Sequence, residues 1–111
     1  MEISITEHKR CSVVSVTGRV DSFTAPKLGE ALTELTNSGI YHIIIDMTAV
    51  QYVSSAGLRV LIDVQKTCKH NGRGELVLVG VPKPIYDTLD LAGFVPLFRF
   101  SDDLTAAVGS F

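Results

Sequence analysis

Runs of β-branched residues alternate with segments of helical periodicity along this chain of 111 residues, and this alternation constrains its fold most strongly. Isoleucines that alternate with polar residues predict a half-buried strand over residues 2–7. A valine-rich run predicts a second strand over residues 12–17, which ends at Gly18. The continuous apolar run over residues 41–47 is typical of a central strand that is covered on both faces.

Two further strands are expected in the second half of the chain. Residues 75–79 form another apolar run with the composition of a strand. Residues 95–100 predict a short strand, and Pro96 places it at an edge of the sheet because proline has no N–H to donate.

Four segments have the apolar spacing of amphipathic helices. The first predicted helix has Thr24 as its N-cap and Pro26 in its first turn, and residues 37–39 end it. The second begins at Ser54-Ser55 and continues to about His70, with cations in its last turns that suit the helix dipole.

The second predicted helix has one polar residue, Gln65, on its otherwise apolar face, and Asn71-Gly72 end it. Two shorter helices follow it. Residues 82–92 predict the third helix, and a cap within residues 101–103 starts a last helix that carries apolar residues between 104 and 108.

The resulting order of elements, β-β-α-β-α-β-α-β-α, predicts one α/β domain over residues 1–111. Strands that alternate with helices imply right-handed crossovers and a mainly parallel sheet. We therefore expect a single mixed, mainly parallel sheet of about five strands, covered by about four helices.

The composition narrows the classes of function. The formal net charge is −2 at pH 7, so no basic field points to DNA, RNA or an anionic membrane. The apolar stretches are too short to span a bilayer, and the first residues do not resemble a signal peptide. The two cysteines, Cys11 and Cys68, form no Cys-x-x-Cys pair, which fits a reduced compartment. We expect a cytoplasmic protein without direct membrane insertion.

The common motifs of enzymes are missing from the sequence. It contains no phosphate-binding GxxxxGKS/T loop, no GxGxxG turn after a strand and no GxSxG nucleophile elbow. His8, His42 and His70 are scattered and lack the spacing of metal ligands. We therefore expect no catalytic residue, no metal site and no cofactor.

The most informative segment joins the third predicted strand to the second predicted helix. After Asp46, a loop of moderate length leads to Ser54 and Ser55 at the start of the helix. Either serine is suited to cap the helix by accepting a hydrogen bond from a free N–H group. Gly57, in the first helical turn, costs roughly 1 kcal/mol relative to alanine, which requires a reason such as the close approach of another backbone. A helix start also favours an anion, so a serine there can carry phosphate.

Four segments share a pattern with one known family; they are Gly18-Arg19-Val20-Asp21, Ile43-Ile44-Ile45-Asp46, Ser54-Ser55-Ala56-Gly57-Leu58 and Leu91-Ala92-Gly93-Phe94. Together they resemble the STAS domain family, and specifically its stand-alone bacterial anti-sigma factor antagonists. The resemblance extends over essentially the whole chain and implies the α/β fold expected above.

In that family, a serine at this helix start is phosphorylated by a partner that is both anti-sigma factor and kinase. The family motif Asp-Ser-(Ser/Ala/Thr)-Gly-Leu, aligned on Gly57, implies that Ser55 is phosphorylated and that Ser54 replaces the usual aspartate. Asp21 matches the family's acidic residue near the phosphorylated serine, although Asp21 and Ser22 are also suited to shape a turn. The residues expected to contact the partner are Asp21, Ser54, Ser55, Ala56, Gly57 and Leu58.

The resemblance implies a partner-switching function, in which the protein has no chemistry of its own. The unphosphorylated protein binds an anti-sigma factor with serine kinase activity and thereby releases the sigma factor. Phosphorylation blocks this binding, and a phosphatase restores it. An accessory STAS subunit of a membrane transport or lipid-trafficking complex is the alternative. A serine hydrolase that uses Ser55 is a third hypothesis, but it lacks an evident base and a nucleophile elbow.

Overall fold

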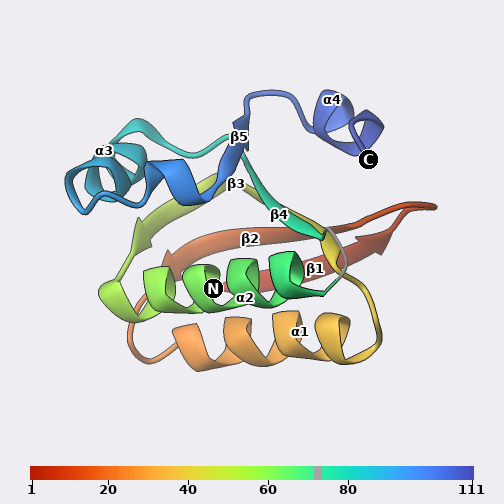
Figure 1. Ribbon diagram of the computed structural model, residues 1–111. Helices are drawn as coiled ribbons and strands as arrows, with labels where there is room; N and C mark the ends of the chain where they lie inside the picture. Colours follow the sequence, from red (N-terminus) through yellow and green to blue (C-terminus); the bar gives the residue numbers. More distant parts are fainter. Residues whose placement is uncertain (72–73) are drawn as a thin grey trace.

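The strands lie in the sheet in the order in which they occur in the chain (Figure 1). A computed structural model describes residues 1–71 and 74–111, which contain one five-stranded sheet. Its strands are β1 (Glu2–Glu7), β2 (Ser12–Val20), β3 (His42–Val53), β4 (Glu75–Val79) and β5 (Arg99–Ser101). The helices are α1 (Ala25–Asn37), α2 (Ser55–His70), α3 (Lys83–Leu91), the 3₁₀-helix η1 (Val95–Leu97) and α4 (Leu104–Gly109).

The sheet is mixed and mainly parallel, as the sequence predicted. β1 pairs with β2 in the antiparallel orientation, whereas the pairs β2–β3, β3–β4 and β4–β5 are parallel. Each parallel pair is joined by a crossover that contains α1, α2, or α3 and η1. Because β2, β3 and β4 point the same way, their ends and the starts of the following helices meet at one edge of the sheet, here called the carboxyl edge.

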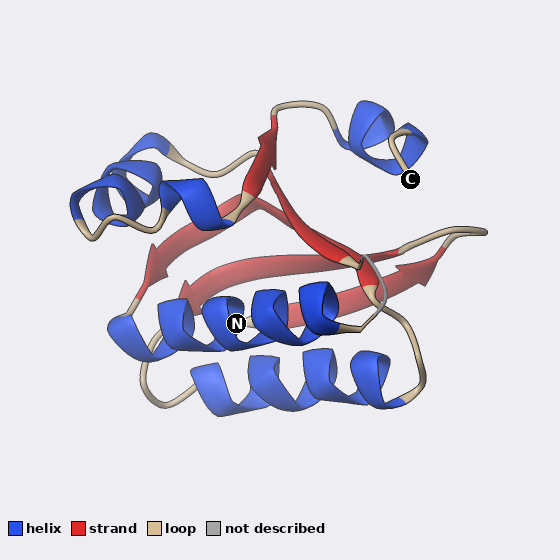
Figure 2. Cartoon of the chain, viewed as in Figure 1, coloured by secondary structure: helices blue, strands red, loops and turns tan. Residues whose placement is uncertain are grey.

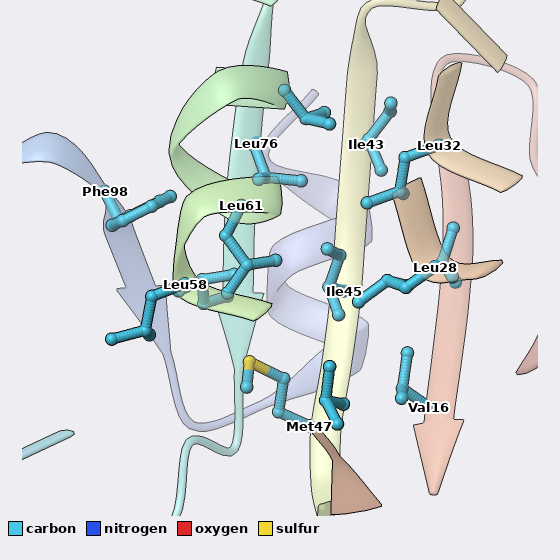
Figure 3. Close-up of a cluster of buried hydrophobic side chains, with 14 of the residues drawn as sticks. Val16, Leu28, Leu32, Ile43, Ile45, Met47, Leu58, Leu61, Leu76 and Phe98 are labelled. Carbon is cyan, nitrogen blue, oxygen red and sulfur yellow. The ribbon is translucent and has the colours of Figure 1, made fainter. Parts of the chain in front are cut away.

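The two faces of the sheet are covered unequally (Figure 2). Residues of α1, α2 and α3 form the larger buried cluster with one face. Figure 3 shows part of this cluster, in which Ile43 and Ile45 of β3 lie between Leu32 of α1 and Leu61 of α2. On the other face, the short helix α4 contributes Ala107 to a smaller buried cluster.

One polar side chain, Gln65, is buried on the apolar face of α2, where it is 3% exposed. Its Nε2 donates to the carbonyl oxygens of Leu76 at 3.1 Å and Leu97 at 2.8 Å, and its Oε1 accepts from the N–H of Leu76 at 2.8 Å. The pairing of β5 covers Val77–Val79 of β4 and does not include Leu76. The Gln65 amide thus satisfies backbone groups of β4 beside the start of β5, which explains the polar interruption in the helical pattern.

Two strands are longer than the sequence predicted. β3 continues to Val53, so the loop expected before Ser54 is wrong, and β2 continues through Gly18 to Val20. These two extensions pair with each other in parallel. A register shift follows Gly18, whose φ of +88° is typical of a β-bulge. The local sequence does not reveal the extensions because each is stabilised by a partner that is distant in the chain.

The strand predicted over residues 95–100 is wrong in its first half. Val95–Leu97 forms η1, and Arg99–Ser101 pairs with β4. Pro96 suits this short helix because its fixed φ is close to helical and its missing N–H is not needed in a first turn. The predicted edge position is confirmed, since β5 is the last strand of the sheet.

The four predicted helices are confirmed, with differences at their ends. Asp103 caps α4 by accepting a hydrogen bond from an N–H in the first turn. Thr24 occupies the N-cap position of α1 as predicted, but its side chain makes no capping hydrogen bond. α2 ends at His70, and Gly72 of its predicted stop signal lies outside the described residues.

We expect Gln65→Met, which keeps a side chain of similar length, to lower the free energy of unfolding by about 1–3 kcal/mol or more. The substitution leaves buried backbone groups of Leu76 and Leu97 without their partner. Urea denaturation measures the change, and Gln51→Met at an exposed position of β3 is the control, with a change within about 0.5 kcal/mol. Equal stability of Gln65→Met and the wild type would contradict the prediction.

Candidate functional site

A backbone hydrogen bond holds the start of α2 against the end of β2. The N–H of Ser54 donates to the carbonyl oxygen of Val20 at 2.8 Å. Ser54 is also the N-cap of α2, and its Oγ accepts from the N–H of Gly57 at 3.2 Å. Of the two neighbouring serines, Ser54 is therefore the one that caps the helix.

Ser55 is the first residue of α2, and its side chain is exposed. The free N–H groups and the dipole of a helix start favour a negative charge at this position. Among the described residues, the hydrogen bonds found at this helix start involve the hydroxyl of Ser54 and not that of Ser55. The two serines thus have different environments, one in a helix cap and one open to solvent.

Gly57 faces the ends of β2 and β3 from the first turn of α2. A Cβ atom at this position would lie 2.8 Å from Cγ1 of Val20 and 2.9 Å from Cγ1 of Val53, well inside the usual contact distance of carbon atoms. It would also lie 3.4 Å from the carbonyl oxygen of Val20. The close approach expected from the glycine is confirmed, and it involves two side chains as well as the backbone.

The other residues of this segment differ in depth. Leu58 is 7% exposed and belongs to the larger buried cluster, and Gly57 is also buried. Ala56 is half-buried and packs against the same cluster. A partner that approaches the carboxyl edge therefore meets Ser55 before it meets the side chain of Leu58. Direct contacts of these residues with a partner stay a prediction.

Asp21 shapes the turn between β2 and α1. Its Oδ1 accepts hydrogen bonds from the N–H groups of Thr24 at 2.9 Å and Phe23 at 3.0 Å, and from the hydroxyl of Thr24 at 3.1 Å. The Thr24 oxygen accepts from the N–H of Asp21 at 2.9 Å, so it serves this turn instead of capping α1. The turn-shaping alternative for Asp21 is therefore observed, and a role of Asp21 in phosphorylation stays a prediction.

The same hydrogen bonds affect the ionisation of Asp21. Those from the backbone and side chain of Thr24 are the main cause, and they hold the pKa of the carboxyl group below its ordinary value of 3.8. Asp21 is therefore a carboxylate at neutral pH, and its charge lies in the turn that leads to α1.

A shallow hollow of about 370 Å³ lies beside Ser55 at the carboxyl edge. Its lining combines the end of β3, the start of α2 and the first turns of α3, including Tyr52, Pro84 and Ile85. The sequence-based expectations did not place α3 at this site. The order of elements nevertheless predicts this position of α3, because helices that follow two parallel strands begin at the same edge of the sheet.

Membrane-spanning helices, metal sites and reactive cysteines are the other features to consider in the described residues, 1–71 and 74–111. None of their helices has the length and apolar composition that a bilayer span requires. They contain no group of three or more His, Cys, Asp or Glu side chains placed to hold a metal ion. Cys11 and Cys68 are free and buried, and burial raises the pKa of the Cys68 thiol to about 11.

A mixed sheet in this order, with helices on both faces and a helix start at its carboxyl edge, agrees with the family whose model matches the chain. The STAS domain model matches residues 2–107, and the chain belongs to the STAS domain family.

Individual relatives match nearly the full length of the chain. The protein BtrV of Bordetella bronchiseptica is 27% identical over 111 residues, which cover 100% of this chain and 95% of that protein. An anti-sigma-B factor antagonist of Staphylococcus aureus is 28% identical over 102 residues, which cover 92% and 94%. The crystal structure of an anti-sigma factor antagonist from Mycobacterium paratuberculosis is similar with a TM-score of 0.83 and 27% identity, over 98% of this chain and 92% of the other.

We expect Gly57→Ala to destabilise the fold, because the added methyl group meets the buried side chain of Val20 and the partly buried side chain of Val53. Overpacking of about 1–3 kcal/mol exceeds the gain in helix propensity of up to about 1 kcal/mol. Gly29→Ala in α1 is the matched control, since its Cβ would lie 3.5 Å from Val60 in ordinary contact. Thermal unfolding should show a lower melting temperature for Gly57→Ala and an equal or higher one for Gly29→Ala. Similar stabilisation by both would contradict the close approach.

The hydrogen bonds of Asp21 predict a pH-dependent contribution to stability. Its folded pKa is lowered, so the contribution is present above the ordinary pKa of 3.8 and is lost as the pH falls through the folded value. We expect Asp21→Ala to lower the free energy of unfolding at neutral pH, and this difference from wild type to shrink in acid. Asp21→Asn, which keeps an acceptor oxygen, should lose less. Urea denaturation across the pH range measures this, and a pH-independent difference would contradict it.

Proposed function

We propose that the protein is an anti-sigma factor antagonist whose binding is controlled by phosphorylation of Ser55. The observation that carries the proposal is the different environment of two adjacent serines. The oxygen of Ser54 accepts a hydrogen bond within the helix cap, whereas the side chain of Ser55 is exposed at the helix start. A kinase requires an accessible hydroxyl group, and Ser55 offers one. The names of the relatives support an anti-sigma factor as the partner.

Phosphorylation of Ser55 is compatible with the fold but not with an interface built for a neutral hydroxyl. A phosphoserine adds about −1.5 to −2 charges at neutral pH. At the exposed start of α2, the helix dipole and free N–H groups favour this charge. Burial of the same charge in an interface without a partner costs several kcal/mol, and each ~1.4 kcal/mol weakens binding tenfold.

The N-cap position of Ser54 explains how a serine can replace the family's usual aspartate there. Serine and aspartate are both good N-caps, so the cap on Gly57 is kept while one negative charge next to Ser55 is removed. The presence of serine instead of aspartate at position 54 therefore removes a negative charge next to Ser55 and keeps the cap of α2.

The partner in this proposal is an anti-sigma factor with serine kinase activity. It binds the unphosphorylated protein, releases its sigma factor, and transfers phosphate to Ser55; a phosphatase removes the phosphate. The protein itself acts by binding, in the cytoplasm where sigma factors work. The relatives named above as antagonists favour this function over the alternative of an accessory subunit in a transport complex.

We expect Ser55→Asp to fold like the wild type, because an acid at the helix start changes the free energy of unfolding by no more than about 1 kcal/mol. We expect it to bind the anti-sigma factor at least ~10-fold more weakly, because its negative charge opposes burial in the interface. Isothermal titration calorimetry measures the affinity. Ser38→Asp is the matched control. It adds the same charge to an exposed serine at the C-terminal end of α1, away from the carboxyl edge of the sheet.

The site of modification provides a direct test. After incubation with the anti-sigma factor and ATP, mass spectrometry should find phosphate on Ser55, and Ser55→Ala should remain unmodified. Phosphate on Ser54 alone, or an unchanged affinity of Ser55→Asp, would overturn the proposal.

A further inference from the structure

Phe23, in the turn between β2 and α1, is 90% exposed. Among the large apolar side chains of the described residues, Leu91 at 92% is the other that is exposed to this extent. Covering an exposed aromatic ring with a partner lowers the free energy, and aromatic residues, Phe included, are enriched in protein interfaces relative to the rest of the surface. Exposure alone does not show that a residue binds a partner. The position of Phe23 and the rigidity of its backbone are therefore the relevant further evidence.

The backbone of Phe23 is held in place by its own turn. The carboxylate of Asp21 accepts from the N–H of Phe23 at 3.0 Å and from that of Thr24 at 2.9 Å. The carbonyl of Asp21 accepts from the N–H of Ala25 at 2.8 Å, which joins the turn to the start of α1. The side chain is therefore presented on a fixed support, and a partner that binds it has little backbone freedom to remove.

The turn lies beside the start of α2. Val20, the last residue of β2, bonds to Ser54 through its carbonyl oxygen at 2.8 Å, and Phe23 follows three residues later. Figure 1 shows the loop after β2 next to the first turn of α2, with α3 on the other side of that turn. Ser55 itself lines the hollow together with Pro84 and Ile85, and its neighbour Ser54 is hydrogen-bonded to the end of β2 that leads into the turn of Phe23.

We propose that Phe23 is an anchor residue for the anti-sigma factor and inserts into an apolar pocket of that protein next to the surface that receives Ser55. This inference rests on the proposed function and assigns it a second contact. Asp21 acts as a positioning residue, since its carboxylate fixes the backbone that carries the ring. Phe23 contributes to the affinity whether or not Ser55 carries phosphate. The phosphorylation state of Ser55 regulates whether the protein binds.

The test compares Phe23→Ala with Leu91→Ala, a control of equal exposure at the last residue of α3, the opposite end of that helix from Pro84. Calorimetric titration with the purified anti-sigma factor should show at least ~10-fold weaker binding for Phe23→Ala and an unchanged affinity for Leu91→Ala. Phosphate incorporation at saturating protein should be normal in both variants, because Ser55 is intact.

A fluorescent variant adds a second readout. The chain contains no tryptophan, so Phe23→Trp and Leu91→Trp each introduce a single reporter. On addition of the anti-sigma factor, the difference spectrum against the wild-type mixture should shift to shorter wavelength for Phe23→Trp and not for Leu91→Trp.

The outcomes separate the inference from the proposed function. If Phe23→Ala binds like the wild type while Ser55→Asp binds more weakly, the anchor is overturned and the function stands. If the wild type does not bind the anti-sigma factor, both fail. A change in the oligomeric state of the free protein on Phe23→Ala, seen by sedimentation, would assign the ring to a contact between copies and overturn the anchor.

Discussion

The contact between the end of β2 and the start of α2 is the constraint on which the candidate site depends. It consists of the hydrogen bond from Ser54 to Val20 and of the close packing that requires Gly57. The parallel pairing of β2 with β3 up to Val53 brings the two segments together. Because the β2–α1 turn continues directly from Val20, a shift of α2 would change the distance between Ser55 and that turn. This junction therefore fixes the start of α2 relative to the turn that leads to α1.

This arrangement allows a switch without a second conformation of the protein. The start of α2 tolerates a negative charge at Ser55, since the helix dipole favours it. In the proposed function, the cost of that charge arises only when a partner covers it, so phosphorylation would change the affinity of a surface and leave the fold as it is. The cap at Ser54 supports this division, because the residue proposed to be phosphorylated is not the one that caps the helix start.

The sequence predicted the architecture because its signals for strands and helices are local. The alternation of residues 2–7, the apolar run of residues 75–79 and the apolar face of α2 are examples of the signals whose order along the chain predicted the fold class. The extension of β3 to Val53 could not be predicted, since it depends on pairing with a distant strand. At the site, Ser54 and Ser55 were found from the helix start and distinguished by the family motif, but which of them caps the helix required the structure. The exposure of Phe23 is likewise a property of the folded chain, because an apolar residue in a loop gives no local sign of its depth.

The amide of Gln65 has a consequence beyond the stability of α2. Edge strands with unpaired backbone groups are templates for strand addition, through which proteins aggregate. β5 is a short edge strand, and beside its start the Gln65 amide already occupies the N–H and carbonyl of Leu76. A strand from another molecule therefore finds no free backbone group of Leu76 to pair with on that side. A single side chain of a helix thus leaves no backbone group of Leu76 unpaired at this border of the sheet.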